Sequence, residues 1–398
     1  MLPTIFQQAV PVLRRLEKAG YEAYFVGGSV RDHILKRLIN DVDIATSAYP
    51  QEVKEIFHKT VDVGIEHGTI LVLEEGREYE ITTFRTESAY ADYRRPDKVE
   101  FIRSLEEDLK RRDFTMNSMA MDGDGKLIDP FHGMEDIHKR LIRTVGSPES
   151  RFSEDALRMM RAIRFVSQLG FGLETSTFNA IREHAGLLQH IAVERKTMEF
   201  EKILAGNWKQ EGLDLLARTS LYIELPNLRS HRTKLEDMAK LPDLGELNKD
   251  QAWLLLLDYI EEDDPRDFLK SWRLPGNTIK ALSKELDILK ERKARGWTKD
   301  LLYRAGLKAA VNVENVYGVM KTSTHSSVEE VIEQYDKLSI TSREQLDVTG
   351  RDLMTWTGQK GGPWLKERLT EIESAIIQET IPNDKEEIRR WLKACNRL

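Results

Sequence analysis

The sequence predicts an α+β fold, in which a sheet domain comes first and all-helical domains follow. Over residues 1–147, short β-branched runs such as DVDIAT and GTILVLEEG are interleaved with helical segments, a texture typical of mixed sheet domains. After Pro148 the strand patterns vanish, and apolar residues recur at three- and four-residue spacing between Gly and Pro breaks. We expect a head at 1–147, a helical neck at 148–210, a helical body at 211–305 and a helical tail at 306–398.

The composition restricts the classes of protein to consider. The 398 residues correspond to two or three domains of about 150 residues each. With 60 Lys and Arg against 67 Asp and Glu, the formal net charge is −7, which excludes a globally basic nucleic-acid binder but not a locally basic face. The single cysteine, Cys395, excludes an internal disulfide and a cysteine-built zinc site. Apolar runs stay well short of the roughly 20 residues of a membrane span and no signal peptide opens the chain, so we expect a cytoplasmic protein without a membrane partner.

The segment YFVGGSVRDHIL predicts a strand, a glycine turn and a helix in the head. Tyr24–Val26 has the strand pattern, and Gly27 with Gly28 marks the turn. Glycine lets the backbone approach a phosphate closely, and a helix N-terminus offers it free N–H groups. Ser29 is placed to cap that helix or to touch a phosphate oxygen, and Arg31 in the first turn suits a nearby anion. Alone, the segment fits an ordinary strand–turn–helix with a surface arginine equally well.

Two carboxylates follow this segment, in the run DVDIAT. If the run is a strand, Asp41 and Asp43 project from one face. They repel each other unless a cation lies between them, and Mg²⁺ prefers carboxylate oxygens together with substrate phosphates. A solvated acidic strand edge is the alternative. A third acid would complete a metal site, and strand alternation allows either Glu78 or Glu80.

Together these motifs resemble a known family. GGSVRD followed by DVDIAT is similar to the first signature of the nucleotidyltransferase superfamily that includes DNA polymerase beta. More narrowly, the chain resembles the class II tRNA CCA-adding enzymes and the bacterial poly(A) polymerases. Six further motifs occur in the family's order: HGTI, EITTFR, RRDFTMNSMA, DPFHG, EDALRMMRAIRF and ERKTMEFEKIL. They cover the first half of the chain closely, and a GRDLM…GGPW stretch resembles the family's tail.

The resemblance implies a fold and a reaction. The head would be a nucleotidyltransferase-type sheet domain, with Glu80 rather than Glu78 as the third acid. Asp41 and Asp43 would hold Mg²⁺, and the enzyme would add C, C and A to the 3′ end of tRNA without a nucleic-acid template. CTP and ATP would be the substrates and pyrophosphate the second product. The alternatives are a poly(A) polymerase or CC-adding enzyme with the same catalytic site, or a non-catalytic RNA-binding protein.

The resemblance also implies contacts to the nucleotide's ribose and phosphates. The residues that match these positions are Arg112, Asp113, Asn117, Arg161 and Arg164. Basic helix faces are the alternative for the arginines, and an intrahelical pair with Lys110 is the alternative for Asp113. Asp113 and Asn117 lie four residues apart and so would share a helix face, which suits sugar recognition.

The run Glu154-Asp155-Ala156-Leu157-Arg158 is expected to read the base. In a helix Asp155 and Arg158 are neighbours, and the local alternative is a weak salt bridge. As a pair, a carboxylate accepts from an exocyclic amino group and a guanidinium donates to a ring acceptor. Cytosine and adenine satisfy both, whereas uracil and guanine leave the carboxylate unpaired, which costs several kcal/mol. Glu154 is expected to orient the pair.

Other expectations concern support and partners. Arg195 and Glu199, four residues apart, are expected to bond each other and stiffen the base pocket, and His67 and His132 are expected to be structural. The polar stretch 86–100, with Arg94 and Arg95, is expected to be a loop. The resemblance makes the tail a tRNA-binding domain, with Lys360 as a candidate contact, and leaves open a homodimer.

Overall fold

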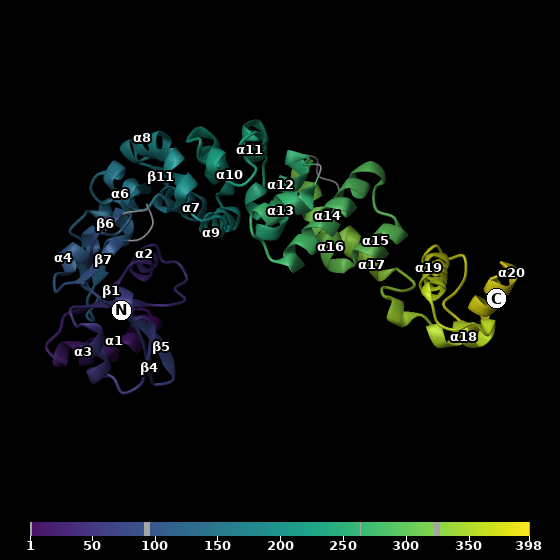
Figure 1. Ribbon diagram of the computed structural model, residues 1–398, viewed down its shortest axis with the longest axis horizontal. Helices are drawn as coiled ribbons and strands as arrows, with labels where there is room; N and C mark the ends of the chain where they lie inside the picture. The colour runs from purple at the N-terminus through teal and green to yellow at the C-terminus, as the bar shows by residue number, and fades with distance from the viewer. Residues whose placement is uncertain (1, 91–95, 263, 322–326, 398) are drawn as a thin grey trace. The chain divides into compact units, whose positions relative to one another are not determined.

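The computed structural model describes residues 2–90, 96–262, 264–321 and 327–397, without the side chains of 87–98 (Figure 1). It confirms the α+β class: the sheet lies in the N-terminal part and helices make up nearly all the rest. Two compact units divide the chain, Met1–Ala239 and Lys240–Leu398. The four-part division into head, neck, body and tail stays a proposal. No helix among the described residues is long and apolar enough to cross a membrane.

The strands of the first unit form one large sheet and two short pairs. The large sheet has the order β3-β4-β5-β2-β1-β8-β9, and only β2 and β5 pair in parallel. Its strands are β1 (Ala23–Val26), β2 (Asp43–Thr46), β3 (Thr60–Gly64), β4 (Thr69–Glu74), β5 (Arg77–Thr83), β8 (Ala120–Met121) and β9 (Leu127–Ile128). The short pairs are β6 (Arg85–Tyr90) with β7 (Pro96–Phe101), and β10 (Leu141–Ile142) with β11 (Gly172–Leu173).

The two faces of the large sheet differ in chemistry. One row on the inner face runs across four strands through Phe25, Ile44, Ile81 and Ile70, all fully buried. The helices α1 (Thr4–Lys18) and α3 (Pro50–Ile56) pack on the sheet, and Phe6 of α1 contacts Phe25 edge-on at a centroid distance of 4.8 Å. Burial of these aliphatic and aromatic side chains supplies most of the driving force for the sheet to form. The opposite face carries the acidic residues described below.

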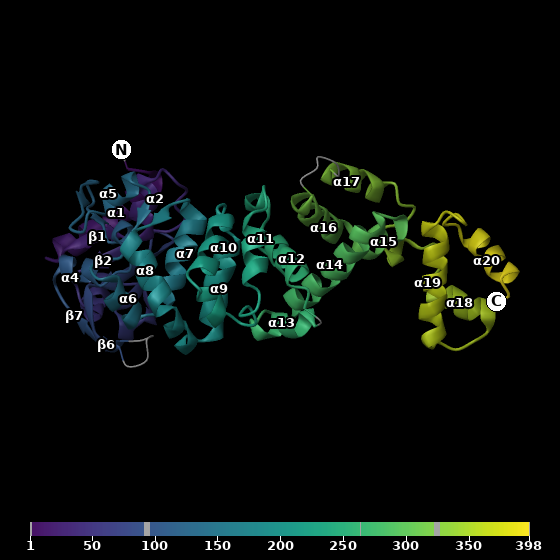
Figure 2. The same cartoon turned by 90° about the horizontal axis from the view of Figure 1, so that it is seen from above.

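Helices complete the first unit. The remaining ones are α2 (Gly28–Ile34), α4 (Leu105–Lys110), α5 (Gly133–His138), α6 (Pro148–Glu154), α7 (Leu157–Leu169), α8 (Thr175–His184), α9 (Val193–Leu204), α10 (Lys209–Arg218) and α11 (Arg232–Ala239). The helix α7 packs against both α9 and α10 (Figure 2). Its apolar side chains are buried almost throughout, so its position is fixed by neighbours on several sides. This rigid helix carries several of the predicted nucleotide-binding residues.

The second unit is helical. Its helices are α12 (Lys249–Ile260), α13 (Pro265–Ser271), α14 (Gly276–Arg295), α15 (Lys299–Ala305), α16 (Leu307–Met320), α17 (Val328–Asp336), α18 (Gly350–Thr357), α19 (Pro363–Ile377) and α20 (Lys385–Ala394). A fully buried pair of indole rings, Trp253 and Trp272, lies in the core around α12 and α13. A separate apolar core that includes Leu353, Ile372 and Ile388 holds α18, α19 and α20 together.

Two expectations about secondary structure are wrong. Residues 85–90 and 96–101, which include most of this stretch, form the antiparallel strands β6 and β7 rather than a loop, because ladder pairing joins backbone groups and does not require an apolar sequence. The candidates Arg94 and Arg95 lie outside the described residues. Strands also do not vanish after Pro148, since β11 pairs in parallel with β10.

Candidate active site

The turn between β1 and α2 requires glycine. Gly27 has φ 71° and ψ −136°, a conformation that residues with a Cβ rarely adopt. A Cβ there would lie 3.2 Å from Arg112 Nη1 and 3.5 Å from Asp43 Oδ2. The turn therefore brings backbone, one cation and one carboxylate close together at the end of β1.

The residues after this turn differ in their roles from the prediction. Ser29 is not the helix cap, because α2 begins at Gly28 and the cap position is Gly27. The Ser29 hydroxyl is buried and donates to the Val26 carbonyl at 3.0 Å, which ties the helix to the strand. Arg31 is also buried and donates to Asn117 Oδ1 at 2.8 Å, so it faces the interior of the site rather than solvent.

The acidic residues meet where β2 and β5 run side by side. Asp43 is the first residue of β2, and Asp41 precedes the strand, so the expected strand includes only one of the two. The register pairs Ile44 with Ile81, which puts Asp43 and Glu80 beside each other one residue earlier. Glu80, rather than Glu78, is thus the acid adjacent to Asp43.

The Asp43 carboxyl lies in a negative environment. Its pKa is raised, first because protein atoms limit its hydration, and then because the charges of Asp41 and Glu80 disfavour ionisation. The charge of Arg112 acts in the opposite direction. In the described part of the chain, no group of three or more His, Cys, Asp and Glu side chains is arranged to hold a metal ion. A cation bound by these acids would need further oxygen ligands, as Mg²⁺ obtains from phosphates.

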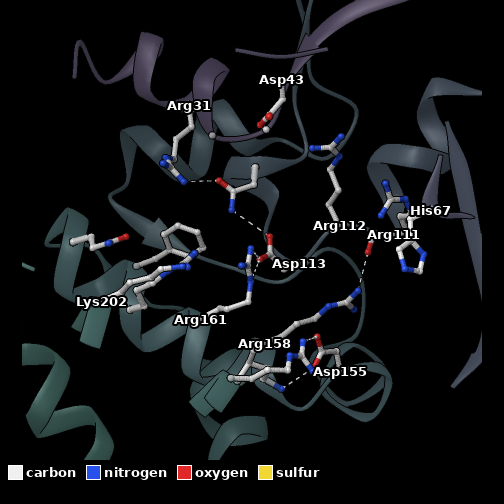
Figure 3. A pocket seen from close by; sticks show the side chains of 18 of the residues that line it. Arg31, Asp43, His67, Arg111, Arg112, Asp113, Asp155, Arg158, Arg161 and Lys202 are labelled. Atoms are coloured by element: carbon white, nitrogen blue, oxygen red, sulfur yellow. Dashed lines mark hydrogen bonds and ion pairs between the residues drawn. The ribbon is translucent and has the colours of Figure 1, made fainter. Parts of the chain in front are cut away.

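A pocket of about 790 Å³ opens beside Asp43 (Figure 3). Nine of the described lining residues are Arg or Lys and three are Asp, so this cavity is basic although the whole chain carries a net charge of −7. A focused positive potential of this kind favours a polyanionic ligand. The predicted site residues that line it are Gly28, Arg31, Asp43, Arg112, Asp113, Asn117, Asp155, Arg158, Arg161, Arg164 and Arg195.

A chain of hydrogen bonds crosses the centre of this pocket. Arg161 donates to Asp113 Oδ2 through Nε at 2.7 Å, and Asn117 Nδ2 donates to Asp113 Oδ1 at 3.2 Å. Burial alone would raise the pKa of Asp113, but the charge and hydrogen bonds of Arg161, with help from Asn117, lower it to about 2. The alternative pairing of Asp113 with Lys110 is wrong, because Lys110 bonds Glu107.

The expected base-reading pair lies at a helix break. The helix α6 ends at Glu154 and α7 begins at Leu157, so Asp155 and Arg158 are not on one continuous helix. The Asp155 carboxylate accepts from the Leu157 backbone N–H at 3.0 Å and from Arg195 Nη2 at 2.9 Å. The local salt bridge between Asp155 and Arg158 is therefore not what holds this carboxylate.

Arg158 has partners of its own. It bonds the Glu154 carboxylate through Nη1 at 2.5 Å and the Arg111 carbonyl through Nη2 at 3.1 Å. Glu154 thus contacts the arginine of the pair directly, as its expected orienting role requires, and also pairs with Arg151. Both Asp155 and Arg158 line the pocket and are held from behind by separate partners (Figure 3).

The two support residues on α9 do not bond each other as expected. Arg195 reaches Asp155, whereas Glu199 pairs with Arg164 on α7 at 3.1 Å. The reason is geometric: α7 packs along α9 and offers each side chain an oppositely charged partner across the interface. Burial, followed by the nearby charge of Arg161, lowers the pKa of Arg164 to about 10. The pair of helices therefore concentrates positive charge at this wall of the pocket.

Five predicted residues lie outside the lining of the pocket: Ser29, Asp41, Glu80, Glu154 and Glu199. Conversely, several lining residues were not predicted from the sequence, and His67 was expected only to be structural. Gln168 and Lys202 had a signal, because Gln168 continues the α7 stripe four residues after Arg164 and Lys202 follows Arg195 by two turns of α9. The remaining missed residues are Arg85, Val99, Arg111, Leu157 and Phe165.

Comparison with known proteins agrees with this arrangement. Residues 23–143 match the family model of the Poly A polymerase head domain. Residues 170–231 match a model described as a probable RNA and SrmB-binding site of polymerase A, and residues 247–392 match one for domain 2 of tRNA nucleotidyltransferases. The chain is 49% identical over 394 residues to a CCA-adding enzyme of Bacillus cereus, covering 99% of each chain. It belongs to the CCA-adding enzyme family.

Other members of the CCA-adding enzyme family extend the likeness. A Geobacillus CCA-adding enzyme is 50% identical over 392 residues, which are 97% of this chain and 96% of the relative. The crystal structure of the Bacillus stearothermophilus CCA-adding enzyme in complex with CTP has a TM-score of 0.92 and 44% identity, covering 100% of this chain and 98% of that one. The fold and the nucleotidyltransferase activity expected from the sequence are confirmed, and the non-catalytic alternative is wrong.

Proposed function

We propose that this enzyme adds C, C and A to the 3′ end of tRNA, with CTP and ATP as substrates and pyrophosphate as the second product. The observation that carries the proposal is that Asp43 lines the same basic pocket as Asp155 and Arg158. A relative of 44% identity was crystallised with CTP, and the Thermotoga maritima CCA-adding enzyme, which shares the fold at a TM-score of 0.69, was solved with tRNA.

The wall around Arg112 and Arg164 suits the triphosphate. Among the described residues, the Nε atoms of both side chains are buried without a hydrogen-bond partner. A buried donor without a partner costs about 1–3 kcal/mol, so phosphate oxygens that accept from these two atoms would recover that cost. Arg31 and Arg161 line the same pocket and add positive charge, while Asp113 and Asn117 offer hydrogen bonds to the ribose.

The acids at the end of β2 suit Mg²⁺. Asp41 and Asp43 would hold the ion, and Glu80 lies next to Asp43 in the strand register. Bound there, Mg²⁺ would acidify the attacking 3′-hydroxyl and neutralise charge on the phosphates. The residues fit such an ion, because burial and then the charges of Asp41 and Glu80 raise the pKa of Asp43, and a bound cation would relieve the repulsion among these acids. Arg112 holds the adjacent phosphate in place for displacement of pyrophosphate.

Asp155 and Arg158 would select the base. Each carboxylate oxygen can accept two hydrogen bonds, so Asp155 keeps acceptor capacity for an amino group after bonding Leu157 and Arg195. Arg158 lines the same pocket, and its guanidinium would donate to the ring acceptor of cytosine or adenine. Because both side chains are already held by other protein groups, a base with the wrong pattern cannot be accommodated by a simple rotation. A carbonyl opposite Asp155 then costs binding free energy.

Nucleotide incorporation on a tRNA transcript that ends at the discriminator base tests the proposal. We expect three additions with CTP and ATP together, and two with CTP alone. A long adenosine tail would indicate a poly(A) polymerase, and a stop after two additions with both nucleotides would indicate a CC-adding enzyme. Asp155→Ala and Arg158→Ala are expected to relax discrimination against UTP, and unchanged selectivity in both variants would contradict the assigned base readers. A homodimer remains a prediction.

A further inference from the structure

The outer face of the sheet carries an apolar row that ends at the catalytic acids. Pairing joins Val61 of β3 to Leu71 of β4, and Leu71 to Glu80 of β5. Glu80 is in turn beside Asp43 of β2. Because directly paired residues share a sheet face, these four side chains form one row across four strands, from two aliphatic groups to two carboxylates.

The aliphatic end of this row is exposed. Val61 is 45% exposed and Val63, at the bulge in β3, is 53% exposed, while Leu71 and Leu73 are half-buried. The strand β3 is also the edge of the sheet. Exposed aliphatic side chains on an open edge favour unwanted association, so their presence beside an active site indicates that the surface contacts a ligand.

The position of Glu80 shows from which side that ligand comes. Asp43 lines the nucleotide pocket, whereas Glu80 is exposed and is not among the described residues that line it. The two acids are neighbours, so the nucleotide lies on the Asp43 side of the pair and the Glu80 side faces the open sheet. The attacking hydroxyl must reach the acids from a direction that the nucleotide does not fill.

We infer that the surface formed by Val61, Val63 and Leu71, here called the β3–β4 patch, docks the 3′-terminal nucleoside of the RNA that receives the new nucleotide. This inference rests on the proposed function. The patch lacks charge along its row up to Glu80, so it suits the apolar faces of a base and ribose rather than phosphates. Of the cations near β3, Lys54 is paired with Asp62, and Lys59 directly precedes the strand, at the end away from Val63.

Photocrosslinking locates the terminal nucleoside directly. A tRNA transcript ending at the discriminator position, with 4-thiouridine as its last nucleotide, is irradiated with the full-length enzyme and no CTP, and the crosslinked peptide is identified by mass spectrometry. We expect crosslinks to the segment from Val61 to Leu71. Crosslinks confined to other segments, in an enzyme that incorporates nucleotides normally, would overturn the inference. Failure of incorporation itself would instead count against the proposed function.

Steady-state kinetics give an independent readout. Val61→Ser and Val63→Ser place small polar side chains at exposed positions, so both variants are expected to fold with unchanged Tm. Loss of apolar contact is expected to raise the KM for the RNA about fivefold, with the KM for CTP unchanged. Leu38→Ser is the matched control, because Leu38 is 85% exposed outside the patch and is expected to alter neither constant.

Two outcomes would contradict this docking role. Equal KM values for the RNA in the Val61→Ser, Val63→Ser and Leu38→Ser variants would show that the patch does not contact it. A change of oligomeric state on light scattering, without a change in the KM for RNA, would show that a second protein chain occupies the patch instead.

Discussion

Arg195 on α9 holds the carboxylate of Asp155, with 2.9 Å between Nη2 and Oδ2. The two residues are 40 positions apart in sequence, and both line the pocket. The ion pair fixes the position of one carboxylate oxygen. The protein, rather than the substrate, therefore sets the direction from which the Asp155 carboxylate can accept further hydrogen bonds. Base discrimination is therefore expected to depend on α9 as well as on the base-reading residues.

Replacing Arg195 with alanine is expected to weaken base discrimination. Without its partner, the Asp155 carboxylate can rotate away from the base, and the penalty for uracil falls by about 1–3 kcal/mol. The ratio of kcat/KM for CTP to that for UTP should then fall by about tenfold or more. Arg218→Ala is the control, since Arg218 forms an exposed pair with Asp214 in the same unit. An unchanged ratio in Arg195→Ala would show that Asp155 is positioned without it.

The strand register predicts different outcomes for two neighbouring glutamates. Glu80→Ala removes the acid beside Asp43 and is expected to lower kcat about a thousandfold or more, as is Asp43→Ala. Glu78→Ala, two residues earlier on the same strand, should retain most of the activity. Single-turnover incorporation of CTP at several Mg²⁺ concentrations measures both. Equal losses in Glu78→Ala and Glu80→Ala would contradict the assignment of the third acid.

Substitutions at two glycines with positive φ distinguish the effect of backbone strain from the effect of crowding in the site. Gly27→Ala and Gly20→Ala both force a residue with a Cβ to adopt a positive φ, 71° and 95° respectively, at about 1–3 kcal/mol. Only at Gly27 would the Cβ press on Arg112 and Asp43, because nothing lies within 4 Å of a Cβ at Gly20. We expect a similar loss of Tm in both variants but at least a tenfold loss of kcat in Gly27→Ala alone. Parallel loss of activity would show that strain, rather than crowding, matters.

The buried pair of Asp113 and Arg161 predicts a pH-dependent stability. Because the pKa of Asp113 falls from 3.8 to about 2 on folding, its contribution is complete above pH 4 and is lost as the pH falls toward 2. The contribution at pH 7 is about 2 kcal/mol. Urea unfolding of the wild type and Asp113→Asn should differ by this amount at pH 7 and by progressively less below pH 4. A constant difference across this range would exclude the pair as its source.

The tail is expected to contact the tRNA backbone near α19. Lys360 is exposed and precedes the Gly362 cap of α19. Lys360→Ala should weaken tRNA binding and reduce the slope of log K against log salt concentration by about 1. Lys337→Ala, at another exposed position of the second unit, is the control. An unchanged salt slope in filter-binding titrations would remove Lys360 from the phosphate contacts.

The sequence predicted the class of the fold and most of the pocket because its motifs are local. The turn at Gly27 and Gly28 and the acid pair at Asp41 and Asp43 each lie within a few residues, where alternation and turn chemistry apply. Even there, the side chain of Ser29 turned inward to the Val26 carbonyl, since a buried carbonyl competes for a hydroxyl as strongly as a helix end does. Local pattern does not decide such a competition.

The partners of the charged residues could not be predicted, because they are set by packing between distant segments. Sequence spacing suggested a bond between Arg195 and Glu199, but α7 supplies Arg164 to Glu199 and the α6–α7 junction supplies Asp155 to Arg195. Opposite charges across a buried helix interface are less screened by water than exposed pairs along one helix. The pairing of β6 with β7 was missed for a related reason, since strand formation depends on the partner strand.

The break between α6 and α7 has a practical consequence for altering this enzyme. Asp155 stands at a junction outside both helices, so changes of its orientation require no helix to unwind. Variants intended to label RNA ends with other nucleotides should therefore begin at Arg195, which redirects the carboxylate while the reading groups themselves stay intact. Substitution of Asp155 or Arg158 removes base selectivity. Substitution of Arg195, which holds the Asp155 carboxylate, offers a graded change in the range of nucleotides that the enzyme accepts.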